Sequence, residues 1–427
     1  MKKGRFMQYV ATICANISSF GIGAAFSWSS PVLARLGNKN YSPFSSPVEP
    51  YFAMMLAALV CLGIAIGPFP LAYMAEKIGR KKTILWMAAP TLISWILIVV
   101  ATSIYQVLVA RFLIGLSGSV VFSIVPRYVA EIAEDDNRGG LGSLLQVFVL
   151  GMLYSYCVGP FCSYQWFCIA CCIIPVVLIL TFIWMPESPY YYAAKGNEEG
   201  TLKCLMRIRG KTKEEAEREA GQIKSMVQEM SNNAGTYKEL FSNKEQRWPL
   251  CIMTGLAVSI PLSGATAVQI YAEPIFQRTN TDLSPAFLAI IIGTKLCPSC
   301  PLPVHTLVVQ QNGQEDPAFD FFCRINHITG FGGITWVIMS EIFPGHLISK
   351  AMAVGASTCN FFAFVVSLMF SQVETWLTPG GLFWLFCIFC LLAFVFVLFT
   401  VPETRGLSFA QIQEKLKKGR KQRQDSS

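Results

Sequence analysis

The chain carries little charge for its length. Of its 427 residues, 14% are Asp, Glu, Lys or Arg, whereas an average soluble domain has about 25%. Hydrophobic residues make up 53%, and the mean hydropathy is +0.47. This composition excludes an ordinary soluble domain and indicates a membrane protein. The sequence also lacks a nucleophile paired with a base and a glycine-rich phosphate loop, so we predict neither an enzyme nor a cofactor.

Two signals of a secreted protein are also missing. The first apolar run is too long for a signal peptide and has no small-residue cleavage site, so we expect an uncleaved first span. The 15 cysteines lie mostly inside apolar runs, as Cys168, Cys171 and Cys172 do. A thiol in such a run behaves as a small hydrophobe, and no disulfide framework is predicted.

Long apolar runs dominate what is present. A helix needs about 20 apolar residues to cross a hydrocarbon core of about 30 Å. Runs of this kind predict an all-α polytopic membrane protein with about ten spans. The predicted spans are 8 to 28, 52 to 74, 83 to 103, 106 to 126, 140 to 162, 165 to 185, 249 to 271, 327 to 343, 351 to 373 and 379 to 401.

The net charge of +8 comes from three basic clusters. The positive-inside rule places all three in the cytoplasm, so both termini are expected there in a plasma-membrane protein. Basic residues next to a span usually orient the protein or touch anionic lipid, so no nucleic-acid partner is predicted. The clusters are Lys2, Lys3 and Arg5; Lys77, Arg80, Lys81 and Lys82; and Arg405, Lys415, Lys417, Lys418, Arg420, Lys421 and Arg423.

The chain divides into four parts. A six-span bundle is expected at 1–186, a cytoplasmic helical linker at 187–247, a second bundle at 248–401 that is incomplete around 295–326, and a basic tail at 402–427. Within the linker, Ile223, Met226, Val227 and Met230 recur at helical spacing and predict a helix with one apolar stripe. The loop after the first span carries Asn40 in a glycosylation acceptor pattern.

Short charged motifs follow several of the spans. Each alone is only a charged loop, in which glycine permits a tight turn and bases can hold carboxylates or helix C-termini. The motifs are Ala72 to Lys82, "AYMAEKIGRKK"; Pro126 to Glu131, "PRYVAE", with Arg138-Gly139; Pro186 to Pro189, "PESP"; Ser340 to Pro344, "SEIFP"; and Pro402 to Gly406, "PETRG".

Taken together, the motifs and their placement resemble the sugar porter branch of the major facilitator superfamily, and within it the insect facilitated trehalose and hexose transporters. The resemblance covers almost the whole chain except about residues 295 to 326. It implies the major facilitator two-bundle fold on a 12-span plan, with bundles built from inverted repeats and a substrate site near the middle of the membrane.

The resemblance also implies a cytoplasmic charge network that locks the bundles together when the site faces outward. Ion pairs made in one conformation and broken in the other bias a two-state equilibrium. The alternative is that these charges only cap helices and set topology. The network residues are Glu76, Arg80, Glu131, Arg138, Glu187, Glu341 and Glu403.

A sugar site is implied on several spans. Amides satisfy sugar hydroxyls, and aromatic faces pack against sugar C–H groups. The alternative for Tyr271 and Trp336 is packing or interfacial anchoring, whereas an amide such as Gln146 inside a membrane usually has a partner or a purpose. The substrate residues implied are Gln146, Val149, Leu153, Ser263, Thr266, Tyr271, Trp336 and Asn360.

Span seven departs from the family pattern. Where the family has two adjacent glutamines before Leu-Ser-Gly, this chain has Ile260 and Pro261, and Thr266 replaces an asparagine. The second bundle therefore loses hydrogen-bonding capacity, and weaker affinity for a polyhydroxylated sugar is expected.

The stretch "GTKLCPSCPLPVHTLVVQQNGQED", Gly293 to Asp316, stands where membrane spans are expected. Its prolines and Lys295 argue against a regular span. Because both termini are expected inside, residues 285 to 326 must cross the membrane an even number of times, and two crossings need more apolar residues than are there. A partial or re-entrant segment is predicted. A zinc site is a minor alternative, with Cys297, Cys300, His305, Cys323 and His327 as ligands.

Two functions remain at this point. The first is facilitative transport of a hexose- or trehalose-class sugar by alternating access. No acidic residue lies between Phe6 and Ala34, where the family's symporters bind a proton, so uniport is expected. The second is a non-transporting relative that serves as a sensor or interaction partner, or a truncated inactive product, which the lost amides and missing ninth span favour.

Overall fold

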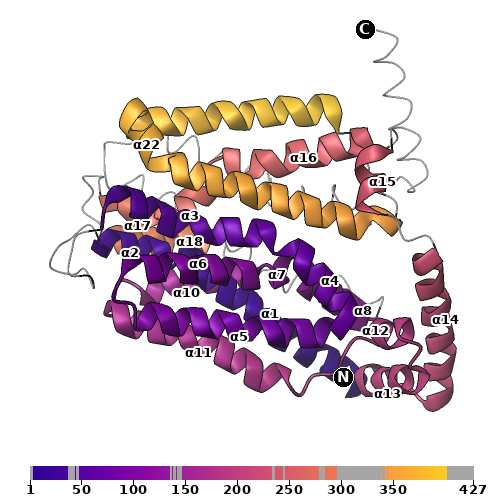
Figure 1. The fold of residues 1–427 in the computed structure, drawn as a ribbon. Coiled ribbons are helices and arrows are strands. Elements are labelled where there is room, and N and C mark those ends of the chain that lie inside the picture. The colour runs from indigo at the N-terminus through magenta and orange to yellow at the C-terminus, as the bar shows by residue number, and fades with distance from the viewer. Residues whose placement is uncertain are drawn as a thin grey trace, which may run out of the picture. The chain divides into compact units, whose positions relative to one another are not determined.

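The computed structural model describes residues 3–36, 44, 48–134, 137, 141, 147–232, 236–243, 246–277, 284–295, 338, 342–343 and 345–401 (Figure 1). These residues form helices and connecting turns, and no strand occurs in the described part of the chain. The all-α prediction is therefore confirmed. The predicted glycosylation site at Asn40 and the alternative zinc ligands lie outside the described residues.

Seven described helical segments are long and apolar enough to cross a membrane, or eight if one bent pair is counted as a span. The prediction of a polytopic membrane protein is confirmed. The predicted span at 327–343 lies almost wholly outside the described residues, and the one at 140–162 is described as the shorter apolar helix α10, Val147–Val158. The seven segments are Phe6–Leu36, Arg80–Val99, Ile104–Ile132, Tyr164–Phe182, Arg247–Gln277, Leu347–Leu377 and Gly381–Thr400.

The bent pair corresponds to the second predicted span. Helix α3, Pro50–Ile66, and helix α4, Pro68–Ile78, meet at an angle of 46°. Pro68 has no N–H to donate, and its ring crowds the preceding turn, so a bend at Gly67 is expected. The first span is also in two parts, α1, Lys3–Ser27, and α2, Ser29–Leu36, which join at Trp28.

The chain divides into two compact units, and the first contains residues 1–231 and 268–313. Within it α1 packs along α10 and α11, Tyr164–Phe182, while α5, Arg80–Val99, packs against α6, Ile104–Gly118, and α11. Helices α3 and α6 approach closely at Gly115, where an added Cβ would lie 2.1 Å from the carbonyl oxygen of Val60. Small residues allow such close backbone packing between membrane helices.

Helix α11 shows how the first unit is suited to a membrane. Trp166 and Trp184 stand near its two ends with 68% and 72% of their surfaces exposed. Eighteen residues of helix span about 27 Å at 1.5 Å per residue, close to the thickness of a hydrocarbon core. Two exposed tryptophans at this separation match the aromatic belts at membrane surfaces.

Further helices complete the first unit. Helix α7, Val120–Ser123, and helix α8, Val125–Ile132, follow α6, and helix α12, Pro189–Ala194, helix α13, Glu198–Arg209, and helix α14, Lys213–Asn232, follow α11. Leu205 of α13 packs against Ala216 and Ile223 of α14, whereas Met226 is 48% exposed. The Gln8 side chain of α1 donates to the carbonyl of Ile208 at 3.5 Å, so α13 is attached to the first span.

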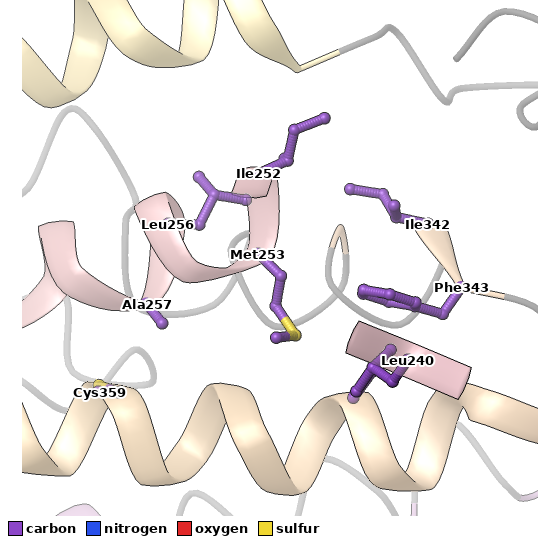
Figure 2. Packing of buried hydrophobic residues seen from close by; sticks show 9 residues of the cluster. Leu240, Ile252, Met253, Leu256, Ala257, Ile342, Phe343 and Cys359 are labelled. Atoms are coloured by element: carbon purple, nitrogen blue, oxygen red, sulfur yellow. The ribbon is translucent and has the colours of Figure 1, made fainter. Parts of the chain in front are cut away.

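The second unit contains residues 232–267 and 314–427. Its described helices are α15, Tyr237–Ser242; α16, Arg247–Leu262; and α22, Gly345–Thr400, which includes two of the apolar spans. Figure 2 shows side chains of Leu240, Met253 and Phe343 gathered between α16 and the helix that carries Cys359. These residues are fully buried, so the unit has an apolar core of its own.

Candidate functional site

A tight turn between spans two and three begins the candidate site. Helix α4 ends at Ile78, α5 begins at Arg80, and Gly79 between them has φ +105°. L side chains rarely adopt this backbone conformation. A Cβ at Gly79 would also lie 2.3 Å from Oε2 of Glu187. Only glycine at this position therefore allows the turn to pack against Glu187.

Glu131 is the centre of the ion pairs in this region. Nη2 of Arg80 lies 3.0 Å from Oε1 of Glu131, and Nε of Arg127 lies 3.0 Å from the same oxygen. The hydroxyl of Ser188 donates to Oε2. The Glu131 and Arg80 side chains are only 11% and 5% exposed. Glu76 is peripheral, since its contact with Arg127 is 4.0 Å long and 66% of its side chain is exposed.

Glu187 binds the backbone at the start of α5. Its Oε1 accepts the backbone N–H of Lys81 at 2.9 Å and that of Ser188 at 3.0 Å. A carboxylate at this position bonds an N–H group that has no partner within the helix and favours the positive end of the helix dipole. Glu187 therefore fixes the motif after span six to the start of span three.

Two tyrosines reinforce the same junction. The hydroxyl of Tyr128 donates to the carbonyl of Pro186 at 2.8 Å, and that of Tyr191 donates to the carbonyl of Lys77 at 3.2 Å. The Arg80 guanidinium also stands over the Tyr191 ring, 5.8 Å from its centroid. The motifs that follow spans two, four and six thus meet at one end of the first unit.

We call Glu76, Arg80, Arg127, Glu131 and Glu187 the charge cluster. The structure brings together the four predicted network residues that lie in the described part of the first unit and adds Arg127, which the motif analysis did not single out. The spacing of Arg127 and Glu131, four residues apart on a helix, was the signal for that pair. The predicted network residues outside the described part are Arg138, Glu341 and Glu403.

The residues predicted to bind sugar fall into three groups. Val149, Leu153 and Tyr271 belong to the first unit, where Val149 and Leu153 are half-buried on α10 and Tyr271 is 6% exposed. Gln146 and Trp336 lie outside the described residues.

The third group belongs to the second unit. The Ser263 hydroxyl donates to the carbonyl of Ile260 at 2.7 Å, and the Asn360 amide donates to the carbonyl of Ala356 at 2.9 Å. Thr266 is 9% exposed. Two of these polar groups thus bond backbone close to them in sequence, and the sugar site as a whole stays a prediction.

Sequence analysis missed a fully buried cation, Arg111 of α6. Its guanidinium donates to the carbonyls of Leu56 at 3.0 Å and Ala25 at 2.5 Å and to the Ser29 hydroxyl at 2.6 Å, and it lies 5.1 Å from the Trp28 ring centroid. All these acceptors are neutral. An arginine inside an apolar run was the signal, because charges within spans are costly and usually functional.

The chain matches the family described as "Sugar (and other) transporter" over residues 6–297 and 318–416. The interruption falls inside the stretch that the resemblance does not cover. The facilitated trehalose transporter Tret1 of Culex quinquefasciatus is 29% identical over 456 residues, which cover 97% of this chain and 86% of that relative. Tret1 of Drosophila virilis is 27% identical over 453 residues, covering 96% of this chain and 48% of the relative. The chain spans about half the length of several of the curated relatives it matches.

A solved structure shows the same fold. The inward-open xylose transporter XylE from E. coli superposes with a TM-score of 0.69 at 19% identity, covering 94% of this chain and 98% of that one. XylE is a protein of the major facilitator superfamily. The family match over most of the chain, together with the apolar spans, leads to one conclusion: the chain belongs to the family of sugar (and other) transporters.

Proposed function

We propose that this protein carries a sugar of the hexose or trehalose class across the plasma membrane by facilitative alternating access, with both termini in the cytoplasm. The observation that carries the proposal is the charge cluster in a chain of this family. Relatives that match 96% or 97% of this chain are named facilitated trehalose transporters.

The charge cluster supports a conformational role beyond topology. Ion pairs on the surface contribute little, but Arg80 and Glu131 are almost completely removed from solvent. Separating such a pair costs several kcal/mol, about 3–5 in comparable cases, unless each partner gains a new one. A cluster of this strength can bias a transporter between two conformations if its members exchange partners during the cycle.

Arg111 supports uniport. Its donors are bonded to two carbonyls and a hydroxyl, and no carboxylate is among the described contacts that satisfy it. Because the Arg111 guanidinium already has neutral acceptors, it does not require an acidic partner on span one. This agrees with the sequence, which has no acidic residue between Phe6 and Ala34. We therefore propose transport without proton coupling through span one.

Uptake in oocytes tests the proposal. Labelled glucose and trehalose are supplied at a range of concentrations to oocytes whose surface expression is verified by biotinylation. Saturable uptake above that of water-injected oocytes is expected, and a proton uncoupler should leave it unchanged. Surface-expressed protein without saturable flux of either sugar would refute the proposal for both. Sugar binding without flux would instead identify a sensor.

A further inference from the structure

The outer half of span seven carries a half-buried acidic residue, Glu273, to which neither the motifs nor the proposed transport cycle gives a role. Helix α17, Ala265–Gln277, follows a turn at Gly264 and is broken at Tyr271, which has φ −109° and ψ 18°. Residues 268–277 belong to the first unit. Glu273 lies just after the break and before Pro274, near the end of the span.

Two hydrogen bonds fasten this segment to the first unit. The hydroxyl of Tyr156 on α10 donates to the carbonyl of Gln269, and the backbone N–H of Glu273 donates to the Ser30 hydroxyl of α2 at 2.9 Å. A regular helix pairs the N–H of residue 273 with the carbonyl of residue 269. The break at Tyr271 makes these two groups available to side chains of α10 and α2.

Apolar packing holds the segment in the same place. Ala272 is fully buried against Met152 and Tyr156 of α10 and Ala289 of α18, Pro285–Lys295. Two hydrogen bonds and this small contact are a modest attachment, since the net contribution of one such bond to stability is small. The attachment is therefore weak enough for the charge of one nearby side chain to control it.

The Glu273 carboxyl is placed to exert that control. Its Oε2 is buried and has no hydrogen-bond partner among the residues that the structure describes. The charged group facing it from α2 is Arg35, whose Nη2 donates to the carbonyls of Gly159 at 2.6 Å and Pro160 at 3.1 Å.

The other described titratable side chains near the segment are two tyrosines and a cysteine. From α10 the group is the Tyr156 phenol, from α17 itself it is Tyr271, and from α3 it is Cys61, which faces Tyr271. The described side chains of α18, from Pro285 to Ile290, have no titratable group. Arg35 is thus the one described charge near Glu273, and it is bonded to carbonyls.

An ionised carboxylate with an unpaired buried oxygen is costly, whereas the neutral acid is much less so. We propose that Glu273 binds a proton from the external solution and that its ionisation releases the outer half of span seven from α2 and α10. An acidic exterior then holds the segment attached, and a neutral or alkaline exterior frees it. This inference rests on the proposed transport function and on the topology that places the end of span seven outside.

Sugar uptake as a function of external pH is the first test. In the wild-type protein we expect uptake to rise about threefold or more as external pH goes from about 5.5 to about 8, because loss of the proton from Glu273 is thermodynamically linked to release of the segment. Glu273→Gln, which is permanently neutral, should stay near the acidic value at every pH. Glu199→Gln, which removes an exposed carboxylate of α13, should keep the wild-type profile. A Glu273→Gln protein that keeps the wild-type pH profile would overturn the inference.

A second test does not need flux. Ser30→Cys is labelled with a membrane-impermeant maleimide in intact cells, and the unmodified protein gives the background from other thiols. Because thiol reactivity itself rises with pH, each rate is divided by that of the Ser30→Cys/Glu273→Gln double variant. The ratio should rise about threefold between the two pH values.

The two tests separate the two proposals. Absence of flux with a rising labelling ratio would refute transport and support proton control of the segment. Flux with a constant labelling ratio and a pH profile shared by the wild type and Glu273→Gln would support transport and refute proton control.

Discussion

Substitution of Glu131 by glutamine is the most direct test of the charge cluster. The change keeps the size of the side chain and removes its charge. Arg80, with a side chain that is 5% exposed, would then be a buried cation without its carboxylate, and the Arg127 contact at 3.0 Å would lose its charge as well. The Ser188 hydroxyl would lose an ionised acceptor.

The size of the expected loss of stability follows from the burial of Arg80 and Glu131. Removing one partner of a buried ion pair costs about 3–5 kcal/mol. Glutamine still offers one carbonyl oxygen to Arg80, and the Arg127 contact is discounted because 36% of that side chain is exposed. We therefore expect Glu131→Gln to lower the free energy of unfolding of the first unit by about 2–4 kcal/mol.

The assay is thermal unfolding of the purified protein in detergent, followed by the fraction that remains monodisperse after heating. The matched control is Glu199→Gln, because Glu199 pairs with Lys203 at 2.5 Å but both side chains are at least 75% exposed. Exposed pairs of this kind contribute little, and no measurable change is expected. If both variants shift the melting temperature equally, burial does not set the strength of the charge cluster, and the reasoning fails.

Two further predictions concern the same end of the first unit. Gly79→Ala should destabilise it by about 1–3 kcal/mol, because Gly79 has φ +105° and an added Cβ would meet Glu187. The control is Gly221→Ala in α14, where an added Cβ would have no neighbour within 4 Å, and this change should stabilise the protein slightly. Equal effects of the two changes in thermal unfolding would contradict the steric argument. Burial raises the pKa of the Cys204 thiol to about 12, and its Sγ donates to the carbonyl of Glu187 at 2.9 Å. This thiol should therefore resist alkylation at neutral pH until the protein is denatured, as mass spectrometry of labelled peptides can show, and rapid labelling in the folded protein would contradict its burial. Because the folded pKa is the higher one, the stability that this thiol contributes is complete below about pH 9 and is lost as pH rises toward 12.

Sequence analysis predicted the membrane class, most of the described spans and the motifs of the charge cluster. These are local properties, because hydropathy over about 20 residues and charge next to a span are legible within a short window. The bend at Gly67 and the break at Trp28 were not predicted, although Pro68 stands at the first of them. The predicted sugar site remains untested, since its residues are shared between two units and Gln146 and Trp336 lie outside the described part.

By itself the sequence determined that this is a polytopic helical membrane protein, because only long apolar helices satisfy the backbone in lipid and this chain is composed of such runs. Only the tertiary structure decided which polar groups meet. Arg80 and Glu131 are 51 residues apart in the chain, Lys81 and Glu187 are 106 apart, and Ser30 and Glu273 are 243 apart. The members of each pair are too far apart in the chain for a short sequence window to contain both. The packing of the spans decides which residues touch, and the apolar pattern does not specify that packing.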